Sequence, residues 1–440
     1  MLNYRRIHDY LLMFLLAASP LLYFPHGAEP FRPLREALFQ MVMTLIMVLF
    51  VLRGWRWKNE HENKKIVLPK AVHTLISIYG VSVIAVMLSG LVNEPRGLNS
   101  FFNYMCGGIL FFAFLDSFSR GRVDRWIAVP SVAVFINGAY AFMQFFGFDP
   151  LFFPLDGENV YRPYLVAGFM DSPNMLAPLL ASFAPYFFCR WLAAESAKNL
   201  FLFTAGLVIL VAPIAMTKNV AGWLGLLTVI SVLLIYFSAH EYRHKAGRFW
   251  RLAACWTCVA VLTIGGITTY RLAGKNIKVL KIRSVNERIT QNRAAWMMFM
   301  ESPLLGNGQG FFYRHFVEYR RAVWFVNHPS HIPEREAHEV HNDYVQLLAE
   351  GGLLTALPLA AILLWFWGSQ FVFFKKSFHQ LKHSGLDLAA IGAAGGFWTI
   401  AVNALGNFPF HIVPLAVTAI FWAAAAYHAI REISYGESNH

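Results

Sequence analysis

The side chains best suited to chemistry lie in the long polar segment of residues 271–355, around one histidine. His341 and Asn342 stand just before an apolar run that predicts a helix, with Asp343 in its first turn. The positive end of a helix dipole disfavours a second positive charge, so His341 is expected to stay neutral. A neutral imidazole facing a wet cavity can act as a general base. His338, three residues earlier, would share its face if the helix began sooner.

Basic side chains near this histidine are of the kind that bind phosphate. The outer loops have no acidic cluster of the type that holds Mg²⁺ or Mn²⁺, so arginines are expected to neutralise phosphate charge without a metal. The candidates are Arg288, Arg162 and Arg293, with Lys218 in the turn of residues 217–219. Asn342, beside His341, is a further candidate for substrate binding. Residues 271–343 hold eleven Lys or Arg against seven Asp or Glu, and a solvated, salt-bridged loop remains an alternative interpretation of that excess.

The elements that must present these residues are membrane helices. The chain is 57% hydrophobic and only 14% charged, which is typical of a polytopic helical membrane protein. Its net charge of +12 must lie in loops, where it favours anionic membrane lipids or phosphate-bearing substrates and makes nucleic acid a poor partner. Neither a disulfide nor a zinc site is expected, because every cysteine lies in an apolar run: Cys106, Cys189, Cys255 and Cys258.

Twelve apolar runs are long enough to cross about 30 Å of hydrocarbon. They cover residues 8–25, 37–54, 71–92, 98–117, 126–147, 172–192, 200–216, 219–239, 252–270, 344–374, 387–406 and 409–430. The chain then divides into residues 1–270 with nine spans, a loop of residues 271–343 that carries the site, and residues 344–440 with three more spans.

The distribution of Lys and Arg predicts the orientation. Basic residues concentrate at the N-terminus and in the loops 53–70, 120–125, 243–251 and 375–382, which all fall on one face. That face is predicted to be cytoplasmic, with both termini on it, because short cytoplasmic loops carry the basic excess. The basic loop 271–343 falls on the outer face, and long loops escape this rule. No cleavable signal is evident at the first run.

Three local patterns refine the outer loops. A capping-box pattern from Ser284 to Glu287 predicts an amphipathic helix that stops at Ser302 and Pro303. The glycine-rich stretch of residues 304–310 lacks the Lys-Ser/Thr of a P-loop and follows no strand, which excludes nucleotide binding there. Pro173 in an apolar context suggests a broken or re-entrant helix, although a simple interfacial loop fits equally well.

These motifs resemble the O-antigen ligase and polymerase superfamily. The resemblance rests on His341-Asn342, nine residues and then Gly352-Leu-Leu-Thr355, on the preceding stretch of residues 286–311, and on Gly168 with Asn174 and Ala177. It spans about residues 160–355. Many members carry a Ser-Arg pair where this chain has Lys218-Asn219.

The resemblance implies a glycosyltransferase of the bacterial inner membrane with a periplasmic active site. It implies that His341 is the essential histidine, with His338 as a competitor, and that Arg288 binds phosphate. Size and loop layout are similar to those of the ligases, which implies transfer of a glycan from undecaprenyl pyrophosphate to a sugar of lipid A core. Direct displacement would invert the anomeric carbon without a metal or other cofactor.

Three alternatives stay open. Two lie in the same superfamily: an O-antigen polymerase, whose acceptor is a second lipid-linked glycan, and a protein O-oligosaccharyltransferase. A lipid or glycan transporter is the alternative from another class, although no repeat relates the two halves and few charges lie inside the spans.

Overall fold

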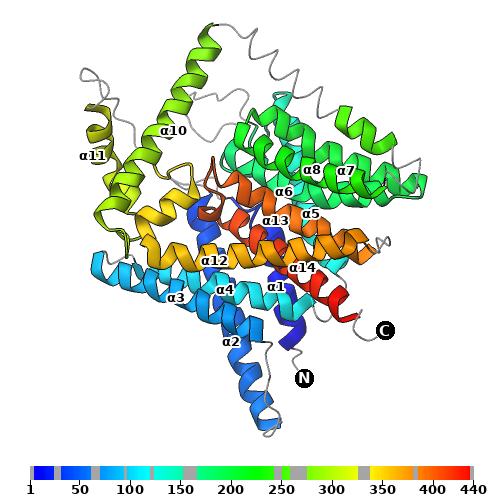
Figure 1. Ribbon diagram of the computed structural model, residues 1–440, viewed down its shortest axis with the longest axis horizontal. Helices are drawn as coiled ribbons and strands as arrows, with labels where there is room; N and C mark the ends of the chain where they lie inside the picture. Colours follow the sequence, from blue (N-terminus) through cyan, green and yellow to red (C-terminus); the bar gives the residue numbers. More distant parts are fainter. Residues whose placement is uncertain are drawn as a thin grey trace.

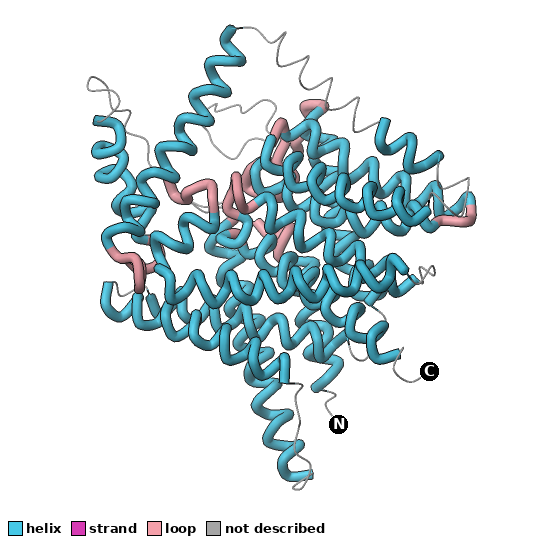
Figure 2. Tube along the Cα trace, viewed as in Figure 1, coloured by secondary structure: helices cyan, strands magenta, loops and turns pink. Residues whose placement is uncertain are grey.

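The computed structural model describes residues 4–23, 31–60, 70–93, 97–118, 123–151, 166–241, 250–257, 275–325, 337–379 and 385–436. Over these residues the chain is helical and contains no strand (Figures 1 and 2). The helices are α1 (Tyr4–Ala18), α2 (Arg32–Glu60), α3 (Lys70–Asn93), α4 (Gly97–Phe118), α5 (Val123–Phe145), α6 (Pro173–Ala193), α7 (Ala197–Thr217), α8 (Val220–Glu241), α10 (Lys275–Glu301), α11 (Phe311–Phe325), α12 (Asp343–His379), α13 (Gly385–Asn403), the 3₁₀ turn η1 (Pro409–His411) and α14 (Val413–Gly436).

The prediction of an all-helical polytopic membrane protein is confirmed. Within the described residues, nine helices are long and apolar enough to cross a membrane: α2 to α8, α12 and α14. The predicted first span corresponds to α1, whose 15 residues give only about 22 Å of helix. The predicted eleventh span corresponds to α13. Most of the predicted ninth span, residues 258–270, lies outside the described residues.

Helices α6 and α13 lie side by side in the centre of the bundle. Their approach depends on glycines in α13, since a Cβ on Gly392 would lie 2.6 Å from the Tyr186 Cα and one on Gly396 would lie 2.6 Å from the Ser182 carbonyl oxygen. Small residues let membrane helices pack backbone against backbone. The apolar side chains around this contact form the main core, which extends to α1, α2, α4 and α14.

One end of the bundle, called here the site end, is where α6, α8 and α12 begin and where α7 and α13 finish. Hydrogen bonds join these helix ends: Asn219 at the start of α8 contacts Asn174 in α6, and the Asp343 amide at the start of α12 donates to Ala404 beyond α13. Helix α1 begins and helix α14 finishes toward the opposite end (Figure 1).

Helices α10 and α11 stand outside the bundle beside the start of α12 (Figure 1). They share a small apolar core with it, which includes Ala295, Phe312 and Ala349. The predicted stop of α10 is confirmed, since the helix finishes at Glu301 before Ser302 and Pro303. The predicted start at Ser284 is wrong, because the helix already runs from Lys275 and the capping-box pattern lies inside it.

Candidate functional site

His341 sits in a strained turn directly before α12. Its φ is +52°, which is uncommon for a residue with a side chain and clusters at functional positions. Asn342 caps the helix, because its Oδ1 accepts the amides of Tyr344 at 3.2 Å and Val345 at 3.3 Å. The Val340 amide donates to the Gln346 side chain at 2.9 Å. These bonds fix the turn from both sides and hold the imidazole in one place.

The environment of His341 keeps the imidazole neutral. Burial lowers its pKa to about 4, assisted by the nearby Arg288 charge and opposed by Glu339 and by hydrogen bonding to the Asn407 side chain. Its Nδ1 is buried and has no hydrogen-bond partner. The ring packs edge to face on Phe408, with centroids 5.0 Å apart. A neutral imidazole is the state that can accept a proton.

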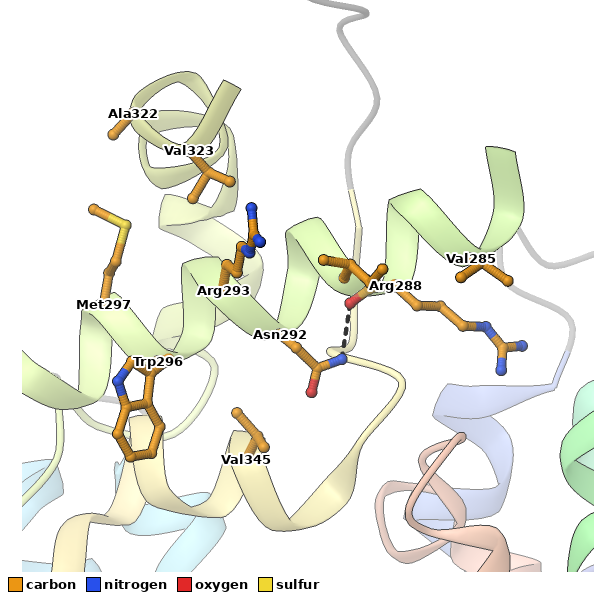
Figure 3. A pocket seen from close by; sticks show the side chains of 10 residues that line it. Val285, Arg288, Asn292, Arg293, Trp296, Met297, Ala322, Val323 and Val345 are labelled. Carbon is orange, nitrogen blue, oxygen red and sulfur yellow. Dashed lines mark hydrogen bonds between the residues drawn. The ribbon is translucent and has the colours of Figure 1, made fainter. Parts of the chain in front are cut away.

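Arg288 on α10 reaches across to the segment that follows α13. Its Nη1 donates to the Gly406 carbonyl oxygen at 2.8 Å. Burial lowers the pKa of this guanidinium. It remains charged, because arginine is not deprotonated in proteins. In Figure 3 the side chain points along α10, away from that of Arg293. One N–H is used by Gly406, and a guanidinium has further donors to offer a phosphate oxygen.

The segment of residues 404–412, called here the α13–α14 loop, carries the contacts of both residues. Asp343 holds this loop, since its Oδ2 accepts the Phe410 amide at 2.8 Å and its Oδ1 lies 2.5 Å from His411 Nδ1. Burial acts to lower the pKa of His411, but the charges of Glu339, Asp343 and Glu350 raise it to about 10. Burial raises the pKa of Asp343 while the His411 charge lowers it, so the contact is a partly buried ion pair.

A chain of asparagines links this loop to the turn that contains Lys218. Asn407 Nδ2 donates to the Asn174 carbonyl oxygen at 2.5 Å, and Asn219 Nδ2 donates to Asn174 Oδ1 at 2.9 Å. Asn219 Oδ1 accepts the Gly222 amide at 2.9 Å, which fixes the start of α8. Lys218 is the left-handed C-cap of α7, with φ +55°, and its side chain is exposed.

Two arginines at the start of α2 hold the loops of the site end. Arg32 Nη1 lies 3.0 Å from Glu339 Oε1, and Glu339 Oε2 accepts Gln346 Nε2 at 2.7 Å. Arg35 is buried and donates to the Phe169 carbonyl oxygen at 2.6 Å. These arginines connect the first long helix to the two loops that precede α6 and α12.

The loop before α6 is described over residues 166–172 and is mostly buried in residues 166–170. The Ala167 and Gly168 amides both donate to Gln144 Oε1, at 3.0 and 2.7 Å, and the Phe169 amide donates to Asn137 Oδ1 at 2.9 Å. Irregular backbone at membrane depth persists when protein groups satisfy it in this way. The helix itself begins at Pro173, in the first-turn position that proline favours.

The glycine-rich turn after α10 docks onto a kink in α12. Gly306 and Gly352 have φ of +69° and +63°, and a Cβ on Gly352 would lie 2.4 Å from the Gly306 nitrogen. Four backbone bonds join the two segments, among them Gly308 N to the Glu350 carbonyl oxygen at 3.0 Å and Leu353 N to the Pro303 carbonyl oxygen at 2.8 Å. The glycines let the turn after α10 approach α12 closely. This contact fixes α10, which carries Arg288, relative to the start of α12, which follows His341.

A groove of about 720 Å³ runs along α10 beside the site (Figure 3). Its walls come from α10, α11 and the first turn of α12. The lining residues are Val285, Arg288, Ile289, Asn292, Arg293, Trp296, Met297, Ala322, Val323 and Val345. Trp296 is half exposed and Val285 is 55% exposed, so the groove presents apolar surface with arginines at its rim.

The structure brings some of the predicted residues together and separates others. Arg288 and His341 converge, and Asn342 caps the helix beside them. Arg293 is exposed and faces α11 across the groove, while His338 stacks on Tyr313 in α11 with ring centroids 4.3 Å apart. The rings of His338 and His341 therefore pack on different elements.

Arg162 lies outside the described residues, so its predicted role remains a prediction. Within the described ranges, no three His, Cys, Asp or Glu side chains are grouped so as to hold a metal ion.

The α13–α14 loop was missed by sequence reasoning. Asn407 and His411 stand in a short connection between two apolar runs, and nothing in their spacing links them to a histidine more than sixty residues earlier. One signal was available in the sequence. Two apolar runs are joined by Asn407-Phe-Pro409-Phe-His411, which places polar side chains and a proline between two spans.

The bundle and its site define a polytopic membrane protein with a histidine and an arginine gathered at one end. Residues 205–360 match the family model described as O-antigen ligase. This match confirms the resemblance to the O-antigen ligase and polymerase superfamily, and it covers Lys218, Arg288 and His341. The family implies a glycosyltransferase-like enzyme that acts on lipid-linked glycans. No curated protein matches the chain.

Proposed function

We propose that this protein transfers a glycan from undecaprenyl pyrophosphate to a sugar hydroxyl of lipid A core, at the periplasmic face of the bacterial inner membrane. The observation that carries the proposal is that His341 and Arg288 meet at the same α13–α14 loop, the imidazole on Phe408 with ring centroids 5.0 Å apart and the guanidinium on the Gly406 carbonyl oxygen at 2.8 Å. Burial and the Arg288 charge lower the pKa of His341, which favours the neutral imidazole. A proton acceptor and a phosphate-binding cation at one place fit displacement of a pyrophosphate by a hydroxyl.

In the proposed step, the acceptor oxygen forms a bond to the anomeric carbon while the bond from that carbon to the pyrophosphate oxygen breaks. His341 takes or orients the hydroxyl proton. Arg288 stabilises the negative charge that develops on the leaving pyrophosphate, which stays attached to the polyprenyl chain. A single displacement inverts the configuration at the anomeric carbon, and a product with retained configuration would contradict the mechanism.

The groove beside α10 supports a lipid-linked donor. Its apolar lining suits the polyprenyl chain, and Arg288 and Arg293 offer positive charge where a pyrophosphate would follow that chain. We assign the donor lipid to this groove on the basis of this combination of apolar lining and charge. Lys218 and Arg162 remain further candidates for contacts with the pyrophosphate or the glycan.

The test uses purified protein in lipid with an undecaprenyl-pyrophosphate glycan and, separately, lipid A core, a second lipid-linked glycan or a serine-containing acceptor peptide. Glycan ladders on lipid A core that vanish in His341→Ala and Arg288→Ala support the ligase. Elongation of the lipid-linked glycan would establish a polymerase instead. A modified peptide would indicate a protein oligosaccharyltransferase, and translocation without a covalent product would indicate a transporter.

Two further measurements belong to this experiment. His338→Ala distinguishes the two histidines, and the transfer rate is expected to fall less than tenfold, because the His338 ring stacks on Tyr313 in α11. EDTA is expected to leave the rate unchanged. Loss with EDTA that a divalent ion restores would overturn the metal-independent reaction.

A further inference from the structure

Gln346 in the first turn of α12 is buried, and both ends of its side-chain amide are used. Its Oε1 accepts the Val340 amide at 2.9 Å, and its Nε2 donates to Glu339 Oε2 at 2.7 Å. The same nitrogen lies 3.5 Å from Glu350 Oε1 on the next turn of the helix. Val340 and Glu339 directly precede His341, so one side chain of the helix holds the segment that leads into the histidine.

The turn at His341 needs such support because its backbone is strained. A φ of +52° is unfavourable for a residue with a side chain, and it persists only where the surrounding contacts enforce it. After the histidine, Asn342 caps α12, and the Asp343 amide donates to the Ala404 carbonyl oxygen at 3.0 Å. Before the histidine, Gln346 supplies the contacts, so that the strained residue is held from both sides.

The support continues from this turn into the bundle. Glu339 is 6% exposed, and its second oxygen, Oε1, lies 3.0 Å from Arg32 Nη1 at the start of α2. The carboxylate is therefore paired with a guanidinium on one side and with the Gln346 amide on the other. Since α2 belongs to the main core, the turn is fixed relative to the membrane helices as well as to α12.

We propose that Gln346 is a positioning residue for His341: its side-chain amide ties Val340 and Glu339 to the first turn of α12 and so holds the strained turn that presents the imidazole. A carboxamide offers an acceptor and a donor in one uncharged group, and the Val340 amide and the Glu339 carboxylate require both. A carboxylate at this position would instead place a further negative oxygen against those of Glu339 and Glu350.

The inference rests on the proposed function for its catalytic meaning, but its first test needs no activity. Gln346→Met keeps the length of the side chain and removes both hydrogen bonds. The buried Val340 amide then lacks its acceptor, so its hydrogen–deuterium exchange is expected to become about tenfold faster or more. Mass spectrometry with fragmentation that resolves this single amide provides the measurement.

Gln370→Met is the matched control. Gln370 is also buried, lies further along α12 beyond its kink, and accepts the Trp398 indole N–H at 2.6 Å. The same substitution there removes a buried hydrogen bond of the same helix, and it should leave Val340 exchange as in the parent. Thermal unfolding checks that each variant is folded.

Unchanged Val340 exchange in a folded Gln346→Met protein would overturn the proposal. If that variant does not fold, Gln346→Asn replaces it. This variant retains the amide on a side chain one methylene shorter, which cannot keep both bonds at their present lengths. It is expected to speed Val340 exchange as well, and unchanged exchange would overturn the proposal in the same way.

The second test separates positioning from a general structural role. With lipid-linked donor and lipid A core, Gln346→Met is expected to lower kcat about tenfold or more while the donor KM changes less than about threefold, because the groove assigned to the donor does not include Gln346. Gln370→Met should leave kcat near that of the parent. Equal losses in kcat and donor affinity, or an unchanged kcat despite faster exchange, would contradict the positioning role.

The two failures can be told apart. Faster Val340 exchange in Gln346→Met while the parent shows no transfer to any acceptor would sustain the support of the turn and refute the proposed function. Transfer by the parent with unchanged Val340 exchange in the variant would do the reverse.

Discussion

At the scale of single residues, the site depends on how burial and charge set the protonation of two histidines. His341 has its pKa lowered to about 4 by burial and by Arg288, whereas carboxylates around His411 overcome its burial and raise its pKa to about 10. One ring is therefore neutral and the other charged at pH 7. The neutral ring is available for proton transfer, and the charged ring serves as a structural cation.

The first prediction concerns the pH dependence of glycan transfer. A base must be unprotonated, so kcat/KM is expected to stay level from pH 7 to pH 5 and to fall only as pH approaches about 4, the pKa of His341. Initial rates with donor and lipid A core across this range provide the measurement. An acid limb near pH 6.5, the ordinary value for histidine, would mean that a solvated imidazole is the base.

The second prediction separates the two arginines of α10. Arg288→Lys is expected to lower kcat about tenfold or more, because an ammonium cannot hold the Gly406 carbonyl and a phosphate in one planar fork. Arg293 is exposed at the groove rim, so Arg293→Lys is expected to change kcat less than threefold. Steady-state kinetics with varied donor tests both, and equal losses in the two variants would contradict this division of roles.

His341 and Arg288 could be predicted from sequence because both belong to local motifs with fixed spacing. The part played by the α13–α14 loop could not, since its contacts with Arg288 and Asp343 join residues 118 and 67 positions apart in the chain. The strain at His341 was also invisible, because a positive φ in a residue other than glycine leaves no sequence signature.

At the scale of elements, the contact between α12 and the turn after α10 determines the distance between the two catalytic candidates. Gly352 has φ +63°, and an added Cβ would meet the Gly306 nitrogen and the Leu304 carbonyl oxygen, each at 2.4 Å. Gly352→Ala is therefore expected to destabilise the protein by more than about 1 kcal/mol, the amount that a left-handed backbone alone costs an L-residue. Thermal unfolding in detergent and the transfer rate should both decline.

Gly368→Ala is the matched control for this change. It lies in the same helix, its Cβ would meet nothing within 4 Å, and alanine is a better helix former than glycine. The control is expected to be neutral or slightly stabilising. If both variants behaved alike, the kink would not matter to the α10–α12 contact.

The α13–α14 loop gives a prediction of stability against pH. His411 has a folded pKa of about 10, above its ordinary 6.5, so its contribution is complete below about pH 6.5 and is lost as pH rises through 10. Melting temperature is expected to fall between pH 7 and 10 in the parent and to fall less in His411→Gln. Parallel curves for the two proteins would contradict the buried ion pair with Asp343.

Helices were predicted well where a long apolar run defines them, and less well where apolar and charged residues alternate. The spans that became α2 to α8 follow from apolar length alone. The start of α10 was placed nine residues late, because the basic residues before Ser284 gave no apolar period, although Lys and Arg are good helix formers. The docking of the glycine-rich turn on α12 is tertiary and had no local signal.

At the scale of the whole molecule, connections between distant parts of the chain assemble the site. Arg32 and Arg35 at the start of α2 hold the loops before α12 and α6, and the asparagine chain joins α6 and α8 to the α13–α14 loop. Both arginines lie at the site end, on the face opposite the loops that carry most of the basic residues. Their partners explain why charges occur at this end: they fix loops that the membrane helices cannot position.

The last prediction concerns which side of the membrane this end faces. The distribution of basic loops predicts that the site end is periplasmic and the opposite end cytoplasmic. Glu318 on α11, whose side chain is 71% exposed, marks the site end, and the exposed Lys198 at the start of α7 marks the other. Each is replaced singly by cysteine after the four native cysteines are changed to serine. A membrane-impermeant maleimide is expected to label Glu318→Cys in cells with a permeabilised outer membrane and Lys198→Cys only after lysis. The reverse pattern would place the site in the cytoplasm, away from any acceptor displayed on the outer leaflet, and would exclude the proposed transfer on topological grounds alone.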